Sequence, residues 1–332
     1  MLRREFIILL GGLAVGHPIL LTLPRPSFAQ IPNVPRVGYL FPFTKAESQD
    51  LWQACRRGLR EFGYVEGQNI FLEPRWAEGQ YDRFPGLMNE LLQLKVDVLV
   101  AASAPASRAA KAATSTIPIV FVAVADPVGI GLVSTLSRPG GNVTGLSLLT
   151  TDMSGKRLAL LKEILGKLSR VAVLMNPASP STPIFLAETK AAAGRLGTEL
   201  QMLEARNPAE IDSAFAAYDT QGADALMIFD DPTLWSHRAQ ITALAAARKI
   251  PTMGGFRDFA DAGALLSYGP DRPDHYLRTA AYVSKILKGA MPADLPVEQA
   301  VKFQLIVNGK TAKSLGIEIH PQLLATADEV IE

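Results

Sequence analysis

The stretch of residues 97–127, DVLVAASAPASRAAKAATSTIPIVFVAVADP, decides the fold of this chain. Residues 97–101 and 119–125 are short apolar runs, which are typical of strands buried on both faces of a sheet. Between them, Ser103 stands where a helix would begin, and the helix expected at residues 105–113 opens with proline. A strand, a helix and a second strand in this order predict parallel strands joined by a right-handed crossover.

The same alternation extends on both sides of this stretch. It predicts earlier strands and helices, and it begins again after the turn-rich cluster at residues 138–142. The expected strands are residues 37–41, 70–75, 97–101 and 119–125, and then 171–175, 199–203, 225–229, 251–254 and 264–268. The expected helices are residues 48–62, 82–94, 105–113, 185–196, 211–218 and 240–248. We therefore predict an α/β protein with two Rossmann-like lobes, each a doubly wound parallel sheet, and a ligand cleft between them.

The composition favours a globular protein of two domains and excludes several functions. Of the 332 residues, 48% are apolar and 20% are charged, which is enough to form sizeable cores. Since 33 basic and 32 acidic residues give a net charge of +1, we expect no basic face for nucleic acid. A single cysteine, Cys55, excludes an intrachain disulfide, and the four scattered histidines do not suggest a metal site.

Residues 1–29 have the three parts of an export signal. Arg3 and Arg4 precede an apolar stretch that glycine and proline interrupt, and a small-residue cleavage site, Ser-Phe-Ala, ends at Ala29. We predict a signal peptide cleaved after Ala29 and a nearly neutral periplasmic protein, with a retained membrane anchor as the alternative. The paired arginines fit a twin-arginine signal as well as an ordinary secretory signal, so both types of export stay open.

In open parallel sheets, ligands bind beyond the carboxyl ends of the strands, where the N-termini of helices attract anions. The loops expected at those ends carry hydroxyl, carboxylate, amide and aromatic side chains that suit a small organic ligand. The seven candidate ligand-binding residues are Phe43, Ser103, Asp126, Asn176, Asp231, Trp235 and Phe256.

Several of these candidates also have a purely structural interpretation. Ser103 could donate a hydrogen bond to a ligand carboxylate, or it could only cap the helix that follows it. Asp126 and Asp231 both precede proline, so each could pair with a ligand ammonium or only form a turn. Most aromatic residues belong to a core, but Phe43 and Trp235 follow strand ends within loops, which favours contact with a ligand.

The sequence lacks the motifs of common hydrolases and nucleotide-binding proteins. It contains no G-x-S-x-G, H-E-x-x-H or phosphate-binding loop, and residues 129–134 lack the third glycine of a dinucleotide fingerprint. We therefore predict a binding protein without enzymatic activity, cofactor or metal. The alternative is an exported α/β hydrolase-like enzyme that acts in the same cleft, with His237, Asp230 and Asp231 as its acid and base groups.

Many segments, in matching order, carry a resemblance to a known family. They include RREF at residues 3–6, GYVEGQN at 63–69, RWAEGQYDR at 75–83, LSRPGGNVTG at 136–145 and DLPVEQ at 294–299. Over nearly its whole length, the chain resembles the substrate-binding proteins of bacterial ABC transporters, in the group related to the tryptophan- and tyrosine-type periplasmic binding proteins.

This resemblance implies the type I periplasmic binding fold, in which a three-segment hinge joins two lobes. The implied first lobe comprises residues 36–144 and 269–296, and the second comprises residues 145–268 and 297–332. The resemblance also implies closure of the lobes around a small, amino-acid-like ligand, aromatic ones included. The protein would act as a monomer and deliver this ligand to a membrane permease.

Three candidate residues match the family by position: Ser103 after the third strand, and Asp126 and Asp231 in the two Asp-Pro pairs. The loop after the first strand departs from the family, because residues 41–43 read Phe-Pro-Phe in place of smaller polar residues. This departure favours a more apolar ligand than an ordinary amino acid.

Overall fold

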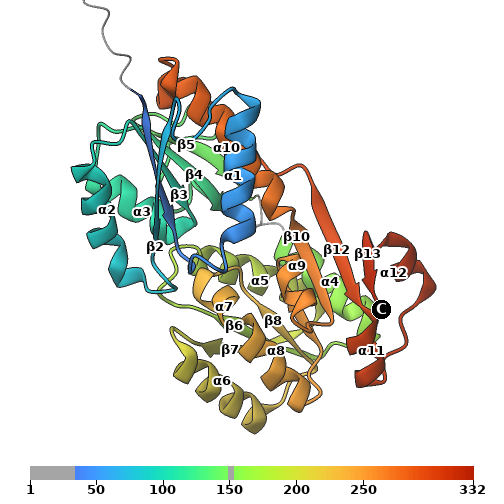
Figure 1. Cartoon of the computed structure of the whole chain (residues 1–332). Coiled ribbons are helices and arrows are strands. Elements are labelled where there is room, and N and C mark those ends of the chain that lie inside the picture. Colours follow the sequence, from blue (N-terminus) through green and yellow to red (C-terminus); the bar gives the residue numbers. More distant parts are fainter. Residues whose placement is uncertain (1–33, 149–152) are drawn as a thin grey trace, which may run out of the picture. The chain divides into compact units, whose positions relative to one another are not determined.

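The computed structural model describes residues 34–148 and 153–332, so the predicted signal peptide, residues 1–29, lies outside the described residues. Within them, two sheets form the centres of two α/β lobes (Figure 1). The α/β fold with two parallel-dominated sheets, predicted from the sequence, is confirmed. Among the described helices, none combines the length and the apolar character needed to cross a bilayer.

The first sheet is parallel throughout, with the strand order β11-β5-β4-β3-β1-β2. Its strands are β1 (Arg36–Phe41), β2 (Phe71–Trp76), β3 (Val98–Ala102), β4 (Ile119–Val124), β5 (Val143–Ser147) and β11 (Glu298–Gln299). Helices α1 (Gln49–Glu61) and α10 (Arg272–Leu287) cover one face, and α2 (Phe84–Gln93) and α3 (Ala104–Ala113) cover the other (Figure 1). Burial on both faces explains why the inner strands β1, β3 and β4 are largely apolar runs.

The second sheet repeats the order of β1 to β5 and has two further strands, β12 and β13, at one edge. Its order is β13-β12-β10-β9-β8-β6-β7, so β6 to β10 take the places that β1 to β5 have in the first sheet. The strands are β6 (Arg170–Met175), β7 (Glu199–Glu204), β8 (Ala225–Ile228), β9 (Thr252–Gly254), β10 (Leu266–Pro270), β12 (Phe303–Asn308) and β13 (Glu329–Ile331). The repeat shows that the two lobes share one topology.

The expectation that residues 264–268 would complete the second sheet is wrong. β12 pairs antiparallel with β10, and β13 pairs parallel with β12. An antiparallel strand at the edge of an otherwise parallel sheet is common, and the alternation of strand and helix does not predict it.

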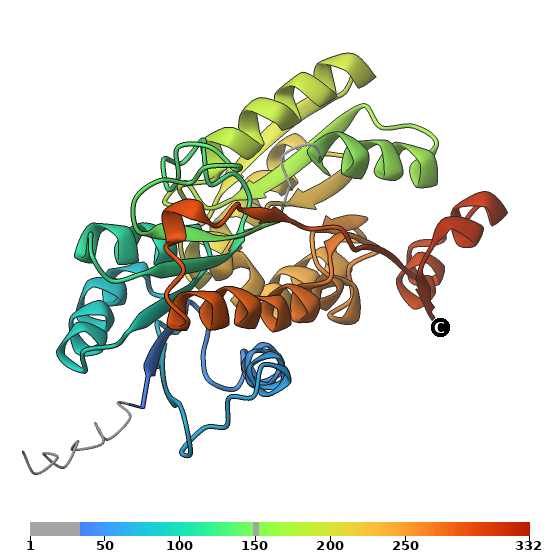
Figure 2. The ribbon, with the colours of Figure 1, turned by 90° about the horizontal axis from the view of Figure 1, so that it is seen from above.

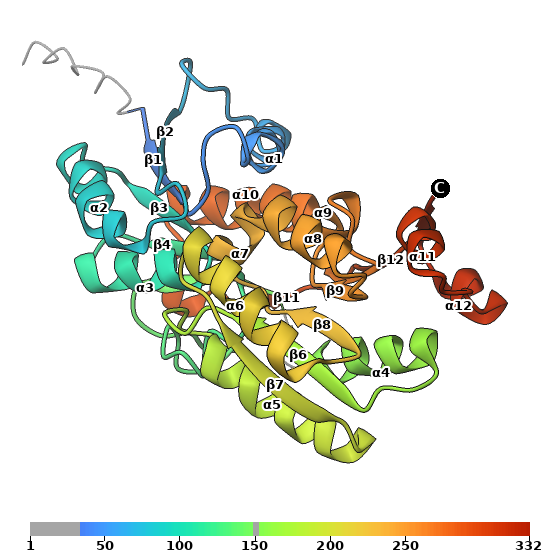
Figure 3. The same ribbon diagram turned by 90° about the horizontal axis from the view of Figure 1, so that it is seen from below.

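Helices cover both faces of the second sheet (Figure 3). On one face lie α4 (Met153–Leu165) and α5 (Thr182–Leu196), and on the other lie α6 (Pro208–Gln221), α8 (Arg238–Ala247) and α9 (Arg257–Asp261). Val171 and Val173 of β6 belong to the same core cluster as α4 and α5, whereas Ala172 and Leu174 belong to the cluster of α6 and α8. This alternation follows from the two-residue period of a strand.

The chain passes between the two sheets after β5, after β10 and after β11. The first of these passages follows the buried strand β5, and residues 149–152 within it lie outside the described part. β11 pairs with β5, so the first sheet extends past the predicted boundary at residue 296. The lobe boundaries as a whole stay a prediction. Figure 2 shows the extended segment of β11 and β12 leading from α10 to the C-terminal helices α11 (Gly309–Leu315) and α12 (Pro321–Thr326).

A continuous cluster of buried apolar side chains extends from the first sheet into the second. It includes Phe41 and Phe43 at the end of β1, and Trp235 and Phe256 from the loops that follow β8 and β9. The lobes therefore pack against each other at the carboxyl ends of their strands, which is where parallel sheets place ligands.

Candidate functional site

A buried cavity of about 40 Å³ lies at the carboxyl ends of strands from both sheets. The first lobe contributes Phe43, Ser103 and Ala123 to its lining. The remaining lining residues are Asp230, Asp231, Pro232, Trp235 and Phe256 from the second lobe, with Arg272 and Tyr276 from the start of α10. This volume admits a few water molecules but is well below the ~150 Å³ of a cavity that holds benzene. The lobes are thus closed around a small space.

Five of the seven candidate residues line this cavity: Phe43, Ser103, Asp231, Trp235 and Phe256. They come from four loops that are far apart in the sequence, and each loop follows the end of a strand. Asp126 and Asn176 are not among its described lining residues.

Three aromatic rings surround the guanidinium group of Arg272, the first residue of α10. Its central carbon lies 4.4 Å from the ring centroid of Trp235, 4.9 Å from that of Phe256 and 5.1 Å from that of Phe43. Arg272 is 5% exposed, and its Nη1 donates to Asp258 Oδ2 at 3.2 Å. Contacts between a desolvated cation and aromatic faces stabilise by about 2 kcal/mol, so the rings hold the guanidinium in place.

Asp230 forms a buried ion pair with Arg157 of α4, whose Nη2 lies 2.9 Å from Asp230 Oδ2. Arg157 Nε also donates to the carbonyl of Tyr268 at 2.9 Å. Gly255 packs directly against this pair, and a Cβ at that position would overlap Asp230 Oδ1. Only glycine permits this close approach, because it has no side chain.

Asp231 caps the short helix α7 (Pro232–Ser236) and also links the two lobes. Its Oδ1 accepts hydrogen bonds from the backbone N–H groups of Thr233 and Leu234 and from the Asn176 amide. Its Oδ2 accepts a bond of 2.5 Å from the hydroxyl of Tyr81, which belongs to the first lobe. Burial raises the pKa of both Asp231 and Tyr81. Both carboxylate oxygens are therefore engaged within the protein.

Two residues that line the cavity have a left-handed backbone conformation. The φ angle is 91° at Ser103 and 59° at Ala123, which costs a residue other than glycine about 1–3 kcal/mol. Ser103 occupies the N-cap position of α3, but its side chain makes no capping hydrogen bond within the described structure. At Ala123, the pairing of β4 with β5 shifts register. Such strain is concentrated at functional sites in folded proteins.

Four buried polar atoms of the lining residues have no hydrogen-bond partner among the described residues. They are Ser103 Oγ, Trp235 Nε1, Arg272 Nη2 and Asp230 Oδ1. An unpaired buried polar group costs about 1–3 kcal/mol, so native proteins rarely retain one without a reason. Three of the four can donate a hydrogen bond, and the carboxylate oxygen accepts one. A ligand with an acidic group and a cationic or donor group would satisfy all of them.

The remaining candidates serve local structure. Asp126 accepts hydrogen bonds from the N–H groups of Val128 and Gly129 at 3.1 and 2.8 Å, so it stabilises the turn after β4. Asn176 is buried and bonds to Asp231 and Thr233. Asn176 therefore supports Asp231, whereas Asp126 supports only its own turn among the described residues.

The acid and base groups of the enzyme alternative do not converge on one cavity in the described structure. His237 lines a different hollow, of about 500 Å³ and open to the surface, which it shares with Asn176 and Tyr81. Burial lowers the pKa of His237. Asp230 is engaged by Arg157 and Asp231 by its capping bonds, so no described base is placed next to a nucleophile here.

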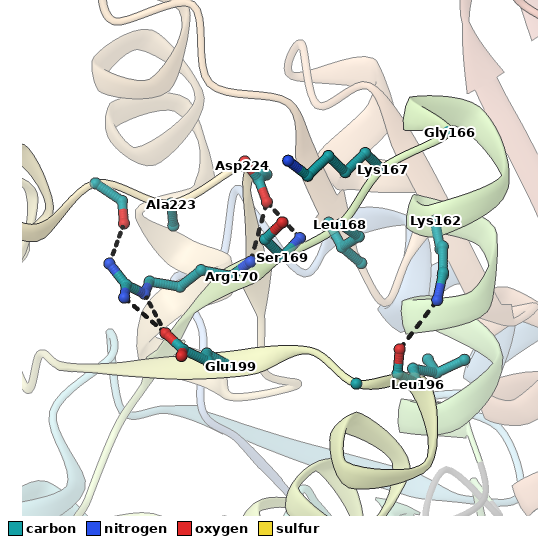
Figure 4. A pocket seen from close by; sticks show the side chains of 12 residues that line it. Lys162, Gly166, Lys167, Leu168, Ser169, Arg170, Leu196, Glu199, Ala223 and Asp224 are labelled. Carbon is teal, nitrogen blue, oxygen red and sulfur yellow. Dashed lines mark hydrogen bonds and ion pairs between the residues drawn. The ribbon is translucent and has the colours of Figure 1, made fainter.

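Another hollow, of about 720 Å³, lies at the amino ends of β6 and β7, opposite the strand ends that face the cavity (Figure 4). Most of its charged groups have partners within the protein: Arg170 pairs with Glu199 at 2.6 Å, and Asp224 accepts from the backbone N–H groups of Ser169 and Arg170. Lys162 donates to the carbonyl of Leu196 at 2.9 Å. This shallow surface therefore has little unmet polar capacity.

Arg157, Arg272, Tyr81 and Tyr276 take part in the site but were not candidates in the sequence. One signal could have indicated Arg272: it follows β10 in the sequence Pro-Asp-Arg-Pro, at the same sheet edge as the other site loops. Arg157 gives no local signal, because its helix is distant in sequence from Asp230.

Two lobes of one α/β topology that enclose a cavity at their strand ends define the type I periplasmic binding proteins. Residues 47–331 match the family model described as ABC transporter substrate binding protein, so the chain belongs to that family. The resemblance inferred from the sequence is confirmed.

Relatives add detail on ligands and on closure. A tyrosine-binding protein of Clostridioides difficile strain R20291 is 27% identical over 263 residues, covering 79% of this chain and 75% of that protein. An ABC domain from Streptococcus pneumonia, solved in complex with L-Trp, is 26% identical, with a TM-score of 0.83 and coverage of 90% of this chain and 99% of that chain. The ligand-free, open structure of a substrate-binding protein from Clostridium difficile has 25% identity, the same coverage and a TM-score of 0.66. The closed arrangement described above thus superposes better on the L-Trp complex.

Proposed function

We propose that this protein is the periplasmic solute-binding component of an ABC importer, which captures a small, amino-acid-like ligand and delivers it to a membrane permease. The observation that carries this proposal is the buried cavity between the lobes, whose unpartnered donors and acceptor match a zwitterion. The tyrosine-binding relative and the relative solved with L-Trp support an aromatic amino acid as the first ligand to test.

The roles of the lining residues follow from their chemistry. Ser103 Oγ and the first N–H groups of α3 suit a carboxylate, because a helix N-terminus carries a partial positive charge. Asp230 Oδ1 suits an ammonium group, while its other oxygen remains paired with Arg157. Phe43 and Phe256 supply apolar surface. Asp231 acts indirectly, since its oxygens hold Tyr81 and α7 in position.

Binding of such a ligand requires the lobes to open and close. At about 40 Å³ the cavity is smaller than an aromatic amino acid, so the lobes must open to admit the ligand and then close around it less tightly than they do here. Opening would separate Tyr81 from Asp231 and Phe43 from Trp235, which are two of the contacts across the cleft. We infer that the three connections between the sheets form the hinge, with lobes of residues 36–144 plus 269–296 and 145–268 plus 297–332.

Export completes this proposal. Residues 1–29 would direct the chain out of the cytoplasm and be removed after Ala29, so that the protein meets its ligand and its permease in the periplasm. The protein would do so as a monomer. No chemical change of the ligand is involved.

Isothermal titration calorimetry on residues 30–332 tests this function. We expect one molecule of L-tyrosine or L-tryptophan to bind per chain, with L-lysine as a comparison ligand. At 100 times Kd the ligand should add ~2.7 kcal/mol to the free energy of unfolding, and mass spectrometry should recover it unchanged. A flat response to a full panel of amino acids and aromatic acids, or conversion of the ligand to a product, would contradict the proposal.

A further inference from the structure

The guanidinium group of Arg272 is held in the cavity wall with part of its hydrogen-bonding capacity unused. Its Nη1 donates to Asp258, a residue whose side chain is 37% exposed. Its Nη2 is buried and has no partner among the residues that the structure describes. A guanidinium group has five N–H donors in a planar fork that matches a carboxylate. The Nη2 side of this fork therefore suits an anionic group.

The aromatic residues around Arg272 cannot provide that anion. Phe43, Trp235 and Phe256 offer only ring faces, which attract the cation without accepting a conventional hydrogen bond from Nη2. Trp235 also carries the guanidinium group of Arg238 at 4.1 Å. Two guanidinium groups therefore lie over the ring of Trp235, which leaves it little free surface for a ligand. We expect Trp235 to position Arg272 and not to stack on the ligand.

We infer that Arg272 is the carboxylate-recognising residue of this cavity, and that Phe43, Trp235 and Phe256 are its positioning residues. This inference rests on the proposed function and deepens it by assigning the groups of the ligand to atoms. The carboxylate of an amino acid binds both Arg272 Nη2 and Ser103 Oγ. Both residues line the same cavity, whose volume of about 40 Å³ holds only a few water molecules. The ammonium group binds Asp230 Oδ1.

This assignment also links recognition to closure. Phe43 belongs to the first lobe, whereas Trp235 and Phe256 belong to the second, so the three rings meet around Arg272 only when the lobes are closed. A ligand carboxylate that fixes Arg272 in this position stabilises the closed form. An amine that lacks the carboxylate does not.

The test compares ligands that differ by one group, and its first part needs no variant. By calorimetry on residues 30–332, we expect L-tyrosine to bind at least about tenfold more tightly than tyramine, which lacks the carboxylate. The pair of L-tryptophan and tryptamine should behave in the same way. If tyramine binds as tightly as L-tyrosine, or tryptamine as tightly as L-tryptophan, the inference is overturned while the proposed function stands.

The second part uses Arg272→Gln, with Arg248→Gln as the matched control, because Arg248 also lies over an aromatic ring, that of Phe215, but does not line the cavity. Loss of a charged hydrogen bond should weaken binding of L-tyrosine by about 10- to 100-fold in Arg272→Gln, against less than about twofold in the control. Arg272→Lys, which keeps the charge without the planar fork, should also weaken binding, and it replaces the glutamine variant if that one fails to fold. Equal affinity in the wild type and the folded Arg272 variant overturns the inference. Absence of binding to every probe by the wild type overturns the proposed function and this inference together.

Discussion

Replacing Tyr81 with phenylalanine should shift this protein toward an open arrangement of its lobes. The hydroxyl of Tyr81 in the first lobe donates to Asp231 Oδ2 in the second at 2.5 Å, and both groups are buried. The substitution removes this bond but keeps the ring, which stacks on Phe84 with 5.8 Å between centroids. Asp231 also keeps its bonds to its own lobe, so each lobe should remain folded.

The magnitude follows from the kind of bond that is lost. A hydrogen bond to a charged buried group contributes about 1.5–3 kcal/mol, which corresponds to a shift of roughly 10- to 150-fold in the ratio of closed to open protein. Because the ligand is enclosed only by the closed form, its Kd should rise by up to the same factor. The rise is smaller where the closed form still dominates in Tyr81→Phe.

Small-angle X-ray scattering and calorimetry together measure this effect. Tyr81→Phe should increase the radius of gyration of the ligand-free protein and weaken ligand binding. Tyr218→Phe is the matched control, because its hydroxyl donates to the carbonyl of Ala223 within the second lobe and should affect only stability. An unchanged scattering profile together with an unchanged Kd in Tyr81→Phe would refute the assignment of this bond as a link between the lobes.

Three further substitutions test the site and its surroundings. Gly255→Ala should lower the free energy of unfolding by about 3 kcal/mol, since the new Cβ would overlap the buried ion pair of Arg157 and Asp230. Gly194→Ala, where no described atom lies within 4 Å of the new Cβ, should raise the free energy of unfolding by about 0.5–1 kcal/mol. Equal effects of the two substitutions in urea unfolding would contradict this expectation. Burial lowers the pKa of His275 to about 4, while its Nε2 donates to the carbonyl of Ser147 at 3.0 Å. The unfolded chain binds this proton near pH 6.5 and the folded chain only near pH 4, so stability is complete above pH 6.5 and should fall by about 3 kcal/mol down to pH 4. In His275→Gln this part of the pH dependence should disappear, and an unchanged profile would show that other groups cause it. Ser103→Ala should weaken ligand binding about tenfold without lowering Tm, because Ser103 Oγ has no hydrogen-bond partner in the described protein. A lower Tm with an unchanged Kd would show that this hydroxyl has only a structural role.

The sequence predicted those parts of the fold that depend on local patterns. Each expected strand corresponds to an observed strand within about two residues. Inner strands such as β3 and β4 were predictable because burial on both faces needs apolar runs. β5 escaped detection because Val143–Ser147 has glycine at its centre. Gly145 has φ 153°, and a Cβ there would overlap the carbonyl of Phe121, so glycine is required for the pairing with β4.

The candidate site was predictable only to the level of loops. The rule that ligands bind at the carboxyl ends of strands placed Phe43, Ser103, Asp231, Trp235 and Phe256 on one cavity. Residue types could not distinguish a carboxylate free for a ligand from one used in a turn, as Asp126 shows. Arg272 was missed because its position depends on rings from three distant loops, which only the folded chain brings together.

The central claim is that the two lobes enclose an unmodified amino-acid-like ligand in the cavity lined by Ser103 and Asp230. A crystal structure of residues 30–332 grown with L-tyrosine or L-tryptophan tests it most directly. We predict intact ligand between the lobes, in a wider cavity than the one described here, with its carboxylate on Ser103 and Arg272 and its ammonium on Asp230. Ligand bound only outside this cavity, or electron density for a converted product, would contradict the claim.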